Sequence, residues 1–370
     1  MTGEFWRDRK VLITGHTGFK GSWLCLWLHR LGARVHGYSL PPPTDPNLYD
    51  QAAVGEVVHS VTGDIREQSK ITDEIARIEP DVIMHFAARS VVLDAYADPV
   101  EAYSTNVVGT ASVLNSVRRL KGRCAVINVT TDKVYENHGW VWGYREDDVL
   151  GGRDPYSNSK ACAELVATAF RQSYFSGEGQ EGCQIGLASA RAGNVIGGGD
   201  WTPHQLIPDT IAALNRGEAV VLRNPGATRP WQHVLDCLSG YLTLAEALYC
   251  DPKKFAGGWN FGPTDADAQP VSRVVELLAA PWGVQSASAW VRDSASYPHE
   301  AMELRLNSQK AERALGWRGR LPLPTALEWT SDWFRGYFAG EPARRLCLSQ
   351  IDQYMASDFR ELNRENERRA

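Results

Sequence analysis

Three glycines near the start of the chain, Gly15, Gly18 and Gly21, constrain its fold more than any other feature. They follow a short apolar run at residues 10–14 and precede an apolar periodic stretch at residues 24–31. A strand, a glycine-rich turn and a helix in this order bind the pyrophosphate of a dinucleotide at the helix N-terminus. The contacts expected from this turn come from Gly15, Thr17, Gly18, Phe19, Lys20 and Gly21.

The rest of the first half alternates between apolar runs of strand length and helical periodicity, which predicts a parallel sheet covered by helices. The expected strands are 11–14, 34–38, 57–63, 82–87, 125–130 and 185–192. Two long helices are expected at about 98–120 and 156–174. The predicted fold class is therefore α/β, a Rossmann-type doubly wound parallel sheet with a smaller C-terminal substrate-binding domain.

A chain of 370 residues exceeds one comfortable hydrophobic core, so two domains are expected. The regular alternation ends after Asn194, where glycine-containing turns become frequent. We expect residues 1–193, plus about 233–256, to form the dinucleotide-binding domain. Residues 194–232 and 257–345 would form the substrate domain, and 346–370 a helical tail.

Composition excludes several other classes of protein. A net charge of −5 with both signs mixed argues against a nucleic-acid partner. The chain has no apolar run long enough for a membrane span, and its polar N-terminus is unlike a signal peptide, so a cytoplasmic location is expected. Seven cysteines without a Cys-x-x-Cys pair indicate reduced thiols rather than disulfides or a metal site. Four of them have apolar neighbours and are expected in the core: Cys25, Cys124, Cys162 and Cys237.

Tyr156 and Lys160 lie four residues apart, which places a phenol and an ammonium on the same face of a helix. The preceding Asp154 and Pro155 are typical of a helix start. An adjacent positive charge favours phenolate and is expected to lower the tyrosine pKa, which makes Tyr156 a candidate base for a hydroxyl proton. In isolation the same spacing also describes an ordinary surface pair.

Thr131, Asp132 and Lys133 follow the expected strand 125–130, at the carboxyl edge where ligands of such sheets bind. Thr131 can donate to a substrate oxygen. Asp132 and Lys133 add an acid and a second amine, which simple alcohol oxidation does not need. The alternative for this pair is a solvated turn.

Several long segments together resemble the CDP-D-glucose 4,6-dehydratases, a family of extended short-chain dehydrogenases/reductases in the NAD-dependent epimerase/dehydratase group. The matching segments are 15–24, 131–133, 140–145, 154–160, 190–201, 229–234, 258–263 and 298–300. Related dTDP-glucose and GDP-mannose dehydratases carry Glu at the position of Lys133. The resemblance covers nearly the whole chain.

The resemblance implies a hydro-lyase that converts CDP-D-glucose to CDP-4-dehydro-6-deoxy-D-glucose by internal hydride transfer through bound NAD and loss of water. Tyr156 with Lys160 and Thr131 would oxidise C4. Lys133 would then remove the C5 proton, or only stabilise the enolate, while Asp132 protonates the departing C6 hydroxyl. Deoxysugar biosynthesis is the family's usual pathway.

The resemblance also implies positions for both ligands. Cofactor contacts would include Asp64, Ile65, Ala87, Ala88, Arg89, Tyr156 and Lys160. Substrate contacts would include Asn194, Arg223, Arg229, Trp231 and His299, and the arginine fork suits phosphate oxygens. His16, His233 and His299 are not spaced as metal ligands, so no metal is expected. Strand 34–38 has no acidic residue directly after it, so NAD rather than NADP rests on the resemblance.

The chain departs from the family pattern after the fourth strand. Arg89, Leu93 and Ala95 stand where the family typically has Gln, Arg and Ser. This leaves open a dehydratase or epimerase acting on a different CDP-sugar. A non-catalytic NAD-sensing regulatory protein is a third alternative, which the complete set of acids and bases disfavours.

The two long helices carry apolar residues on more than one face. Each can bury one face on the sheet and another against a second subunit. A homodimer formed through a helical bundle, or a higher homo-oligomer, is therefore expected.

Overall fold

The computed structural model describes residues 3–175, 184–295 and 301–357. Its largest element is a seven-stranded parallel sheet with strand order β10-β6-β5-β4-β1-β2-β3. The strands are β1 (Lys10–Thr14), β2 (Arg34–Ser39), β3 (His59–Thr62), β4 (Val82–His85), β5 (Arg123–Val129), β6 (Gln184–Ala192) and β10 (Gly257–Phe261). The predicted Rossmann-type sheet and its six expected strands are confirmed, and one strand, β10, is added to them.

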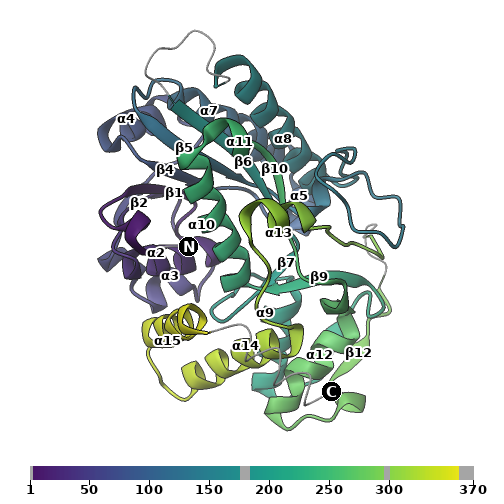
Figure 1. The fold of residues 1–370 in the computed structure, drawn as a ribbon. Coiled ribbons are helices and arrows are strands. Elements are labelled where there is room, and N and C mark those ends of the chain that lie inside the picture. Colours follow the sequence, from purple (N-terminus) through teal and green to yellow (C-terminus); the bar gives the residue numbers. More distant parts are fainter. Residues whose placement is uncertain (1–2, 176–183, 296–300, 358–370) are drawn as a thin grey trace.

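Helices cover both faces of this sheet (Figure 1). One face packs against α4 (Gln68–Ile78), α7 (Gly109–Val117) and α8 (Pro155–Tyr174). The other packs against α2 (Phe19–Arg30) and α10 (Val234–Cys250). Short helices complete this body: α1 (Gly3–Trp6), α3 (Leu48–Gln51), α5 (Val92–Ala97), α6 (Pro99–Tyr103) and α11 (Pro252–Phe255).

The side chains of β1 show why both faces are covered. Val11 and Ile13 enter the core with α2 and α10, whereas Leu12 enters the core with α4 and α7. Successive residues of a strand point to opposite faces, so a strand that is apolar throughout must be buried on both sides. All three side chains are fully buried.

The smaller sheets lie beyond the carboxyl edge of the large one. One has the order β11-β9-β7 and the other pairs β12 with β8. Their strands are β7 (Asn194–Ile196), β8 (Val220–Leu222), β9 (Thr228–His233), β11 (Ala268–Pro270) and β12 (Trp290–Arg292). The helices α9 (Leu206–Arg216) and α12 (Val271–Ala279) pack on them. β10 pairs with β6, so residues 257–261 belong to the large sheet rather than to the expected substrate domain.

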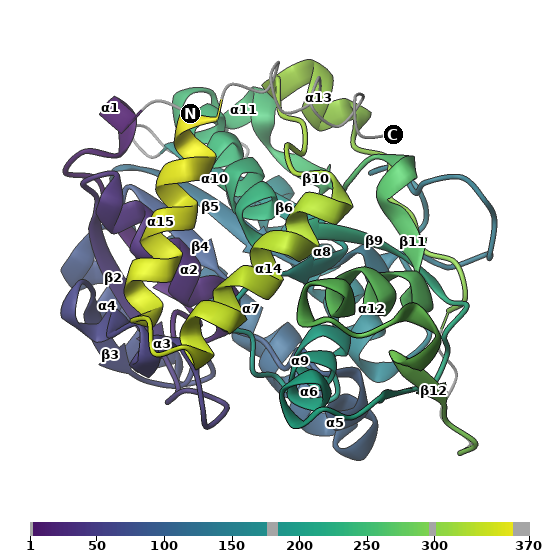
Figure 2. The same cartoon turned by 90° about the horizontal axis from the view of Figure 1, so that it is seen from below.

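The chain ends in helices that return to the large body. They are α13 (Gln309–Leu315), α14 (Leu323–Phe338) and α15 (Ala343–Ala356). Figure 2 shows α15 alongside α2, where Tyr354 packs against Trp27 in the same core. Asp236 at the start of α10 accepts hydrogen bonds from Tyr354 Oη at 2.8 Å and from the Leu321 backbone at 3.0 Å. These bonds fix the tail to the sheet's helical layer.

The expected helix 98–120 is interrupted by a π-helical turn at Ser104–Val108, between α6 and α7. Such turns often lie at functional sites. Asn106 in this turn donates to the Arg89 carbonyl at 3.1 Å and to Ser159 Oγ at 2.9 Å. The turn therefore links the loop after β4 to the helix that carries Tyr156.

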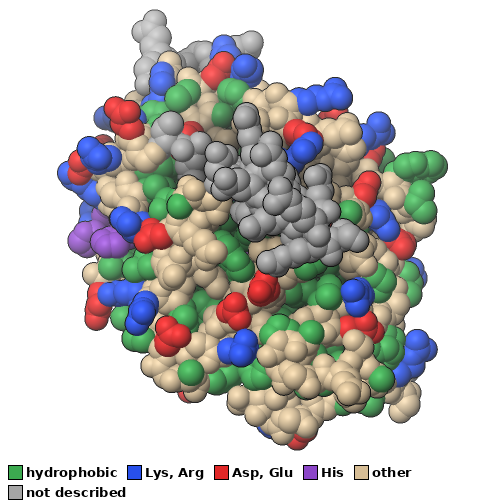
Figure 3. Space-filling view, turned by 60° about the horizontal axis from the view of Figure 1, so that its bottom comes forward, with side chains coloured by type: hydrophobic (Ala, Val, Ile, Leu, Met, Phe, Trp, Pro, Cys, Tyr) green, Lys and Arg blue, Asp and Glu red, His purple; other side chains and the backbone are tan. Residues whose placement is uncertain are grey.

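On the face drawn in Figure 3, Lys and Arg side chains are interspersed with Asp and Glu. Three cysteines expected in the core, Cys25, Cys124 and Cys237, are buried, but Cys162 is only half-buried. Across the described ranges, no helix is long and apolar enough to cross a membrane.

Candidate active site

The glycine-rich turn has the shape that a pyrophosphate needs. Gly15 has φ +76°, and a Cβ there would lie 2.7 Å from the Ala87 nitrogen, so no other residue fits without a shift of the backbone. Gly18 is the N-cap of α2 and has no side-chain cap. A Cβ on Gly21 would overlap the Gly15 carbonyl, which explains the third glycine. The uncapped amides at the start of α2 are free to meet an anion.

The other expected cofactor residues surround this turn. Thr17 Oγ1 lies 2.8 Å from Ser39 Oγ at the end of β2. Ile65 is buried, and the Asp64 carboxylate is held by Arg66 at 2.6 Å. This hydrogen bond lowers the pKa of Asp64, so its charge is retained at neutral pH.

The loop after β4 is held at its backbone. Ala87 follows Phe86 beside Gly15, and the Arg89 amide donates to Asn106 Oδ1 at 2.8 Å. The half-exposed Arg89 guanidinium lies 3.9 Å from the Asp94 carboxylate. Arg89 is thus paired with a residue of α5, the helix that follows its loop.

Thr131, Asp132 and Lys133 form a short turn at the carboxyl end of β5, as predicted. Thr131 Oγ1 donates to Asp132 Oδ1 at 2.9 Å, and Lys133 Nζ lies 3.8 Å from the same oxygen. Asp132 is fully buried, and its Oδ2 has no hydrogen-bond partner among the described residues. A buried carboxylate oxygen without a partner is costly unless a ligand meets it.

Tyr156 and Lys160 lie on the first turns of α8. Asp154 caps this helix by accepting from the Ser157 amide at 2.9 Å, and Pro155 occupies the first turn. The Thr131 side chain interacts with the Tyr156 phenol and acts to lower its pKa, so the phenol and the β5 turn share one site. The structure therefore brings together all five residues predicted to be catalytic.

The expected lowering of the Tyr156 pKa is wrong for this structure. Burial raises the pKa of the phenol, and the hydrogen bond with Thr131 opposes this effect only in part. Lys160 is buried and its Nζ donates to the Val129 carbonyl at 2.8 Å. Burial, followed by the nearby charge of Lys20, lowers the pKa of Lys160 to about 8. Sequence spacing indicated the shared helix face but could not indicate how strongly both groups are desolvated.

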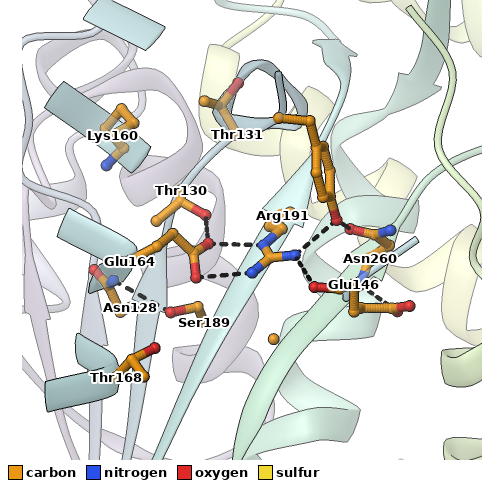
Figure 4. A network of polar contacts seen from close by, with 12 residues as sticks. Asn128, Thr130, Thr131, Glu146, Lys160, Glu164, Thr168, Ser189, Arg191 and Asn260 are labelled. Atoms are coloured by element: carbon orange, nitrogen blue, oxygen red, sulfur yellow. Dashed lines mark hydrogen bonds and ion pairs between the residues drawn. The ribbon is translucent and has the colours of Figure 1, made fainter. Parts of the chain in front are cut away.

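A buried ion pair beside these residues was not predicted (Figure 4). Arg191 of β6 contacts Glu164 of α8 through Nε to Oε1 at 2.9 Å and Nη2 to Oε2 at 3.1 Å. Burial raises the pKa of Glu164, but the charge and hydrogen bonds of Arg191 outweigh it, so this pKa is lowered overall. The available signal was Glu164 at the i+4 position from Lys160, on the same helix face.

Three of the five expected substrate residues, Asn194, Arg229 and Trp231, lie on the small sheets. Asn194 of β7 is directly opposite Trp231 of β9, and its Oδ1 is buried without a partner among the described residues. Arg229 lies two residues before Trp231, and both are buried. Arg223, between β8 and β9, donates to the His204 carbonyl at 3.3 Å. His299 lies outside the described residues.

Three histidines are buried in the structure. His16 and His233, which were expected as packing or pocket residues, are fully buried, and His85 is almost fully buried. Burial lowers their pKa values to about 4 for His16 and about 3 for His85 and His233. All three are therefore neutral in the folded protein at neutral pH. In the unfolded chain they titrate near pH 6.5.

We expect the protein to lose stability as pH falls below about 6.5, because the unfolded chain then binds protons that the folded histidines do not. From about pH 7.5 to 5.5 each histidine costs about 1.3 kcal/mol, roughly 4 kcal/mol in all. Asp236, whose pKa burial raises to about 6, opposes this by about 0.8 kcal/mol. Urea unfolding at the two pH values measures the net loss of about 3 kcal/mol.

His233→Asn is the matched variant, because it removes one buried imidazole and should reduce the net loss by about two fifths. His204→Asn replaces a surface histidine and should leave the loss unchanged. Equal or greater stability of the wild type at the lower pH would contradict this account.

The parallel sheet, the glycine-rich turn and the Tyr-Lys pair facing a polar strand end define an enzyme of the short-chain dehydrogenase/reductase type. Within that class, the chain belongs to the GDP-mannose 4,6 dehydratase family, whose model matches residues 12–329. A curated relative, the CDP-glucose 4,6-dehydratase of Salmonella typhimurium, is 46% identical over 357 residues, covering 96% of this chain and 99% of that protein.

Solved structures show the same fold. The dTDP-glucose 4,6-dehydratase of Bacillus anthracis in complex with NAD has a TM-score of 0.74 at 22% identity and covers 90% of this chain and 98% of its own. DesIV of Streptomyces venezuelae, a dTDP-glucose 4,6-dehydratase with NAD and TYD bound, has a TM-score of 0.74 at 24% identity, covering 89% and 98%.

Proposed function

We propose that this chain is an NAD-dependent CDP-glucose 4,6-dehydratase, a hydro-lyase that converts CDP-D-glucose to CDP-4-dehydro-6-deoxy-D-glucose. The observation that carries the proposal is the meeting of two groups at one sheet edge. The Tyr156 phenol interacts with the Thr131 side chain, and this contact joins an alcohol-oxidising pair to an acid and an amine suited to removing water. The Salmonella relative, similar over nearly its whole length, carries this activity in its name.

The glycine-rich turn suits NAD, because Gly15 and Gly21 let the backbone pack this closely and the start of α2 has no side-chain cap. The residues proposed to hold it are those of the turn together with Asp64, Ile65, Ala87, Ala88, Arg89, Tyr156 and Lys160. When bound, this cofactor supplies the oxidation of the sugar at C4 and the later reduction at C6.

Tyr156 acts at C4 in this proposal. Its phenolate accepts the proton of the C4 hydroxyl as that carbon becomes a ketone, and Thr131 holds the same oxygen. Because burial raises the pKa of Tyr156, the phenol needs a positive charge beside it to act as a base at neutral pH. Lys160, buried on the same helix face, is the described residue placed to supply one.

Asp132 and Lys133 act at C5 and C6. The C4 ketone acidifies the C5 proton, which the neutral amine of Lys133 accepts. The electron pair left at C5 forms a C5–C6 double bond as the C6–O bond breaks. Asp132, in its protonated form, gives its proton to the departing hydroxyl, so the leaving group is water.

The nucleotide is proposed to lie on the small sheets. We propose that Arg229 and Asn194 meet the diphosphate and that Arg223 and Trp231 line the pocket. His299, which lies outside the described residues, is proposed as a further substrate contact. We likewise propose that residues 194–232 and 257–345, without β10, form the nucleotide-sugar-binding domain. Arginine suits this role because its planar fork matches phosphate oxygens.

The direct experiment incubates the purified protein with CDP-D-glucose and NAD and follows formation of the 4-keto sugar by its absorbance in alkali. We expect product without net reduction of the cofactor. Parallel incubations contain other CDP-sugars, dTDP-glucose and GDP-mannose. Turnover of one of these in place of CDP-glucose, or binding of NAD without any turnover, would overturn the proposal.

We also propose a homodimer through the α6 to α7 segment and α8. A hollow on this face is lined almost wholly by apolar atoms, of Pro99, Val100, Tyr103, Ser104, Val107, Val108 and Cys162. Val100 is 77% exposed and Val108 55%, and Leu165 on α8 is 58% exposed. A second copy of the same face would cover these side chains, as closed two-fold interfaces do.

The double variant Val100→Glu with Val108→Glu should convert the dimer to a monomer, because it places charges in the proposed apolar contact. Light scattering after size-exclusion chromatography measures the mass. Val141→Glu changes an equally exposed valine on another surface and should remain dimeric. A monomeric wild type, or a double variant that stays dimeric, would contradict the interface.

A further inference from the structure

The turn that carries Thr131, Asp132 and Lys133 is flanked by two residues that each bond to one member of the buried Glu164–Arg191 ion pair. Before it, Thr130 Oγ1 donates to Glu164 Oε1 at 2.5 Å. After it, Arg191 Nη1 donates to Tyr135 Oη at 2.7 Å, and the Arg191 guanidinium lies over the Tyr135 ring. Glu164 and Arg191 are themselves joined by two hydrogen bonds, so they close a bridge beneath the turn (Figure 4).

The same bridge reaches the other half of the site. Glu164 lies on α8, two turns after Tyr156 and one turn after Lys160, and this spacing places the three on one helix face. Arg191 is anchored further by donating to the Glu146 carbonyl at 2.9 Å. The Glu164–Arg191 pair therefore contacts the strand end, the helix and the loop that together surround the reacting groups.

Stability alone does not explain this pair. The Arg191 side chain is 5% exposed and the Glu164 side chain 3%, so both charges have lost their hydration. Buried ion pairs recover this cost only in part, and apolar residues of similar volume are often at least as stable. What an apolar pair cannot provide is directional bonding at both ends of a turn.

We propose that Glu164 and Arg191 are positioning residues that set where Asp132 and Lys133 lie relative to Tyr156 and Lys160. The inference rests on the proposed function, because it concerns the two groups of residues that this reaction uses in sequence. Misplacement of reacting groups by about 1 Å can cost up to about a hundredfold in rate. Loss of one link to the bridge should therefore slow turnover without weakening substrate binding.

The sharpest test removes the Thr130 hydroxyl and leaves the ion pair intact. Thr130→Val keeps the shape of the side chain but cannot donate to Glu164, whereas Thr130→Ser keeps the hydroxyl. With CDP-glucose we expect the valine variant to lose about tenfold in kcat with KM within about twofold, and the serine variant to approach the wild type. Tyr135→Phe, which removes the second link, should behave like the valine variant.

Two readouts separate positioning from a general loss of structure. Hydrogen exchange followed by mass spectrometry on the unliganded protein should show faster exchange at residues 131–134 in Thr130→Val and not in Thr130→Ser. In an Asp132→Asn background the valine substitution should add little to the loss of rate, because the group that it misplaces is already disabled.

Wild-type rates in the valine variant, or equal losses in the valine and serine variants, would overturn the inference while the proposed function stands. A loss of kcat that merely follows a lowered melting temperature would overturn it as well. A wild type without activity on CDP-glucose would instead overturn the proposed function, and this inference with it.

Discussion

Tyr156→Phe should lower kcat by about a hundredfold to ten-thousandfold, the range expected when a positioned general base is lost. The phenol is nearly buried, interacts with the Thr131 side chain and has a pKa that burial raises. The substitution removes one oxygen and no ring atoms, so the packing of α8 against the sheet should persist. Steady-state kinetics with CDP-glucose measure the loss, and a melting temperature close to that of the wild type shows that the fold is kept.

The pH profile gives an independent check on the same residue. A raised pKa keeps the phenol protonated at neutral pH, so kcat/KM of the wild type should increase toward alkaline pH. Tyr156→Phe should abolish this increase. Tyr103→Phe is the matched control. The Tyr103 hydroxyl donates at 2.7 Å to Asn158, which lies on the same helix as Tyr156, and it has no proposed role in proton transfer. Activity of Tyr156→Phe within a few-fold of the wild type would remove the phenol from the mechanism.

Lys133→Met should abolish exchange of the C5 proton and lower kcat by about a hundredfold or more, because methionine keeps the length of the side chain without its amine. Lys133 Nζ lies 3.8 Å from Asp132 Oδ1, and the Lys133 side chain is only 23% exposed. Lys133→Glu should also impair exchange. Neither change touches the glycine-rich turn, so affinity for NAD, measured by titration, should remain close to that of the wild type.

Deuterium incorporation at C5 during turnover in heavy water tests the role of Lys133 directly. The wild type should incorporate solvent deuterium, and Lys133→Met should not. Lys70→Met, which removes an exposed lysine paired with Glu67 on α4, controls for the loss of a positive charge. Wild-type incorporation in Lys133→Met would show that another group removes the C5 proton.

Local patterns were sufficient to predict most of the large sheet. The glycine-rich turn, six apolar runs and the helix of Tyr156 each carry a signal within a few residues, and each was found where expected. β10 was missed because Gly257–Phe261 has neither alternation nor a continuous apolar run, and only pairing with β6 makes it a strand. The helix α10 was likewise not predicted, since it is buried on nearly all sides and its sequence shows little amphipathic periodicity.

The site was predictable as a list of residues, but not as an electrostatic environment. Spacing placed Tyr156 and Lys160 on one face, yet the depth of burial that raises one pKa and lowers the other depends on residues far away in the sequence. The ion pair between Glu164 and Arg191 could not be predicted for a similar reason. A lone glutamate in a helix usually faces solvent, and its partner lies 27 residues further on, in another strand.

The position of β10 in the sheet also affects how the protein can be made. The chain leaves the sheet after β6, builds β7 to β9 and α10, and only then supplies the strand that covers the outer edge of β6. Until residue 261 has left the ribosome, the nascent chain therefore presents an unpaired apolar strand edge, which is prone to aggregation. Truncations that end between β6 and β10 should accordingly be recovered as insoluble material, even though they contain the strands of the dinucleotide-binding half.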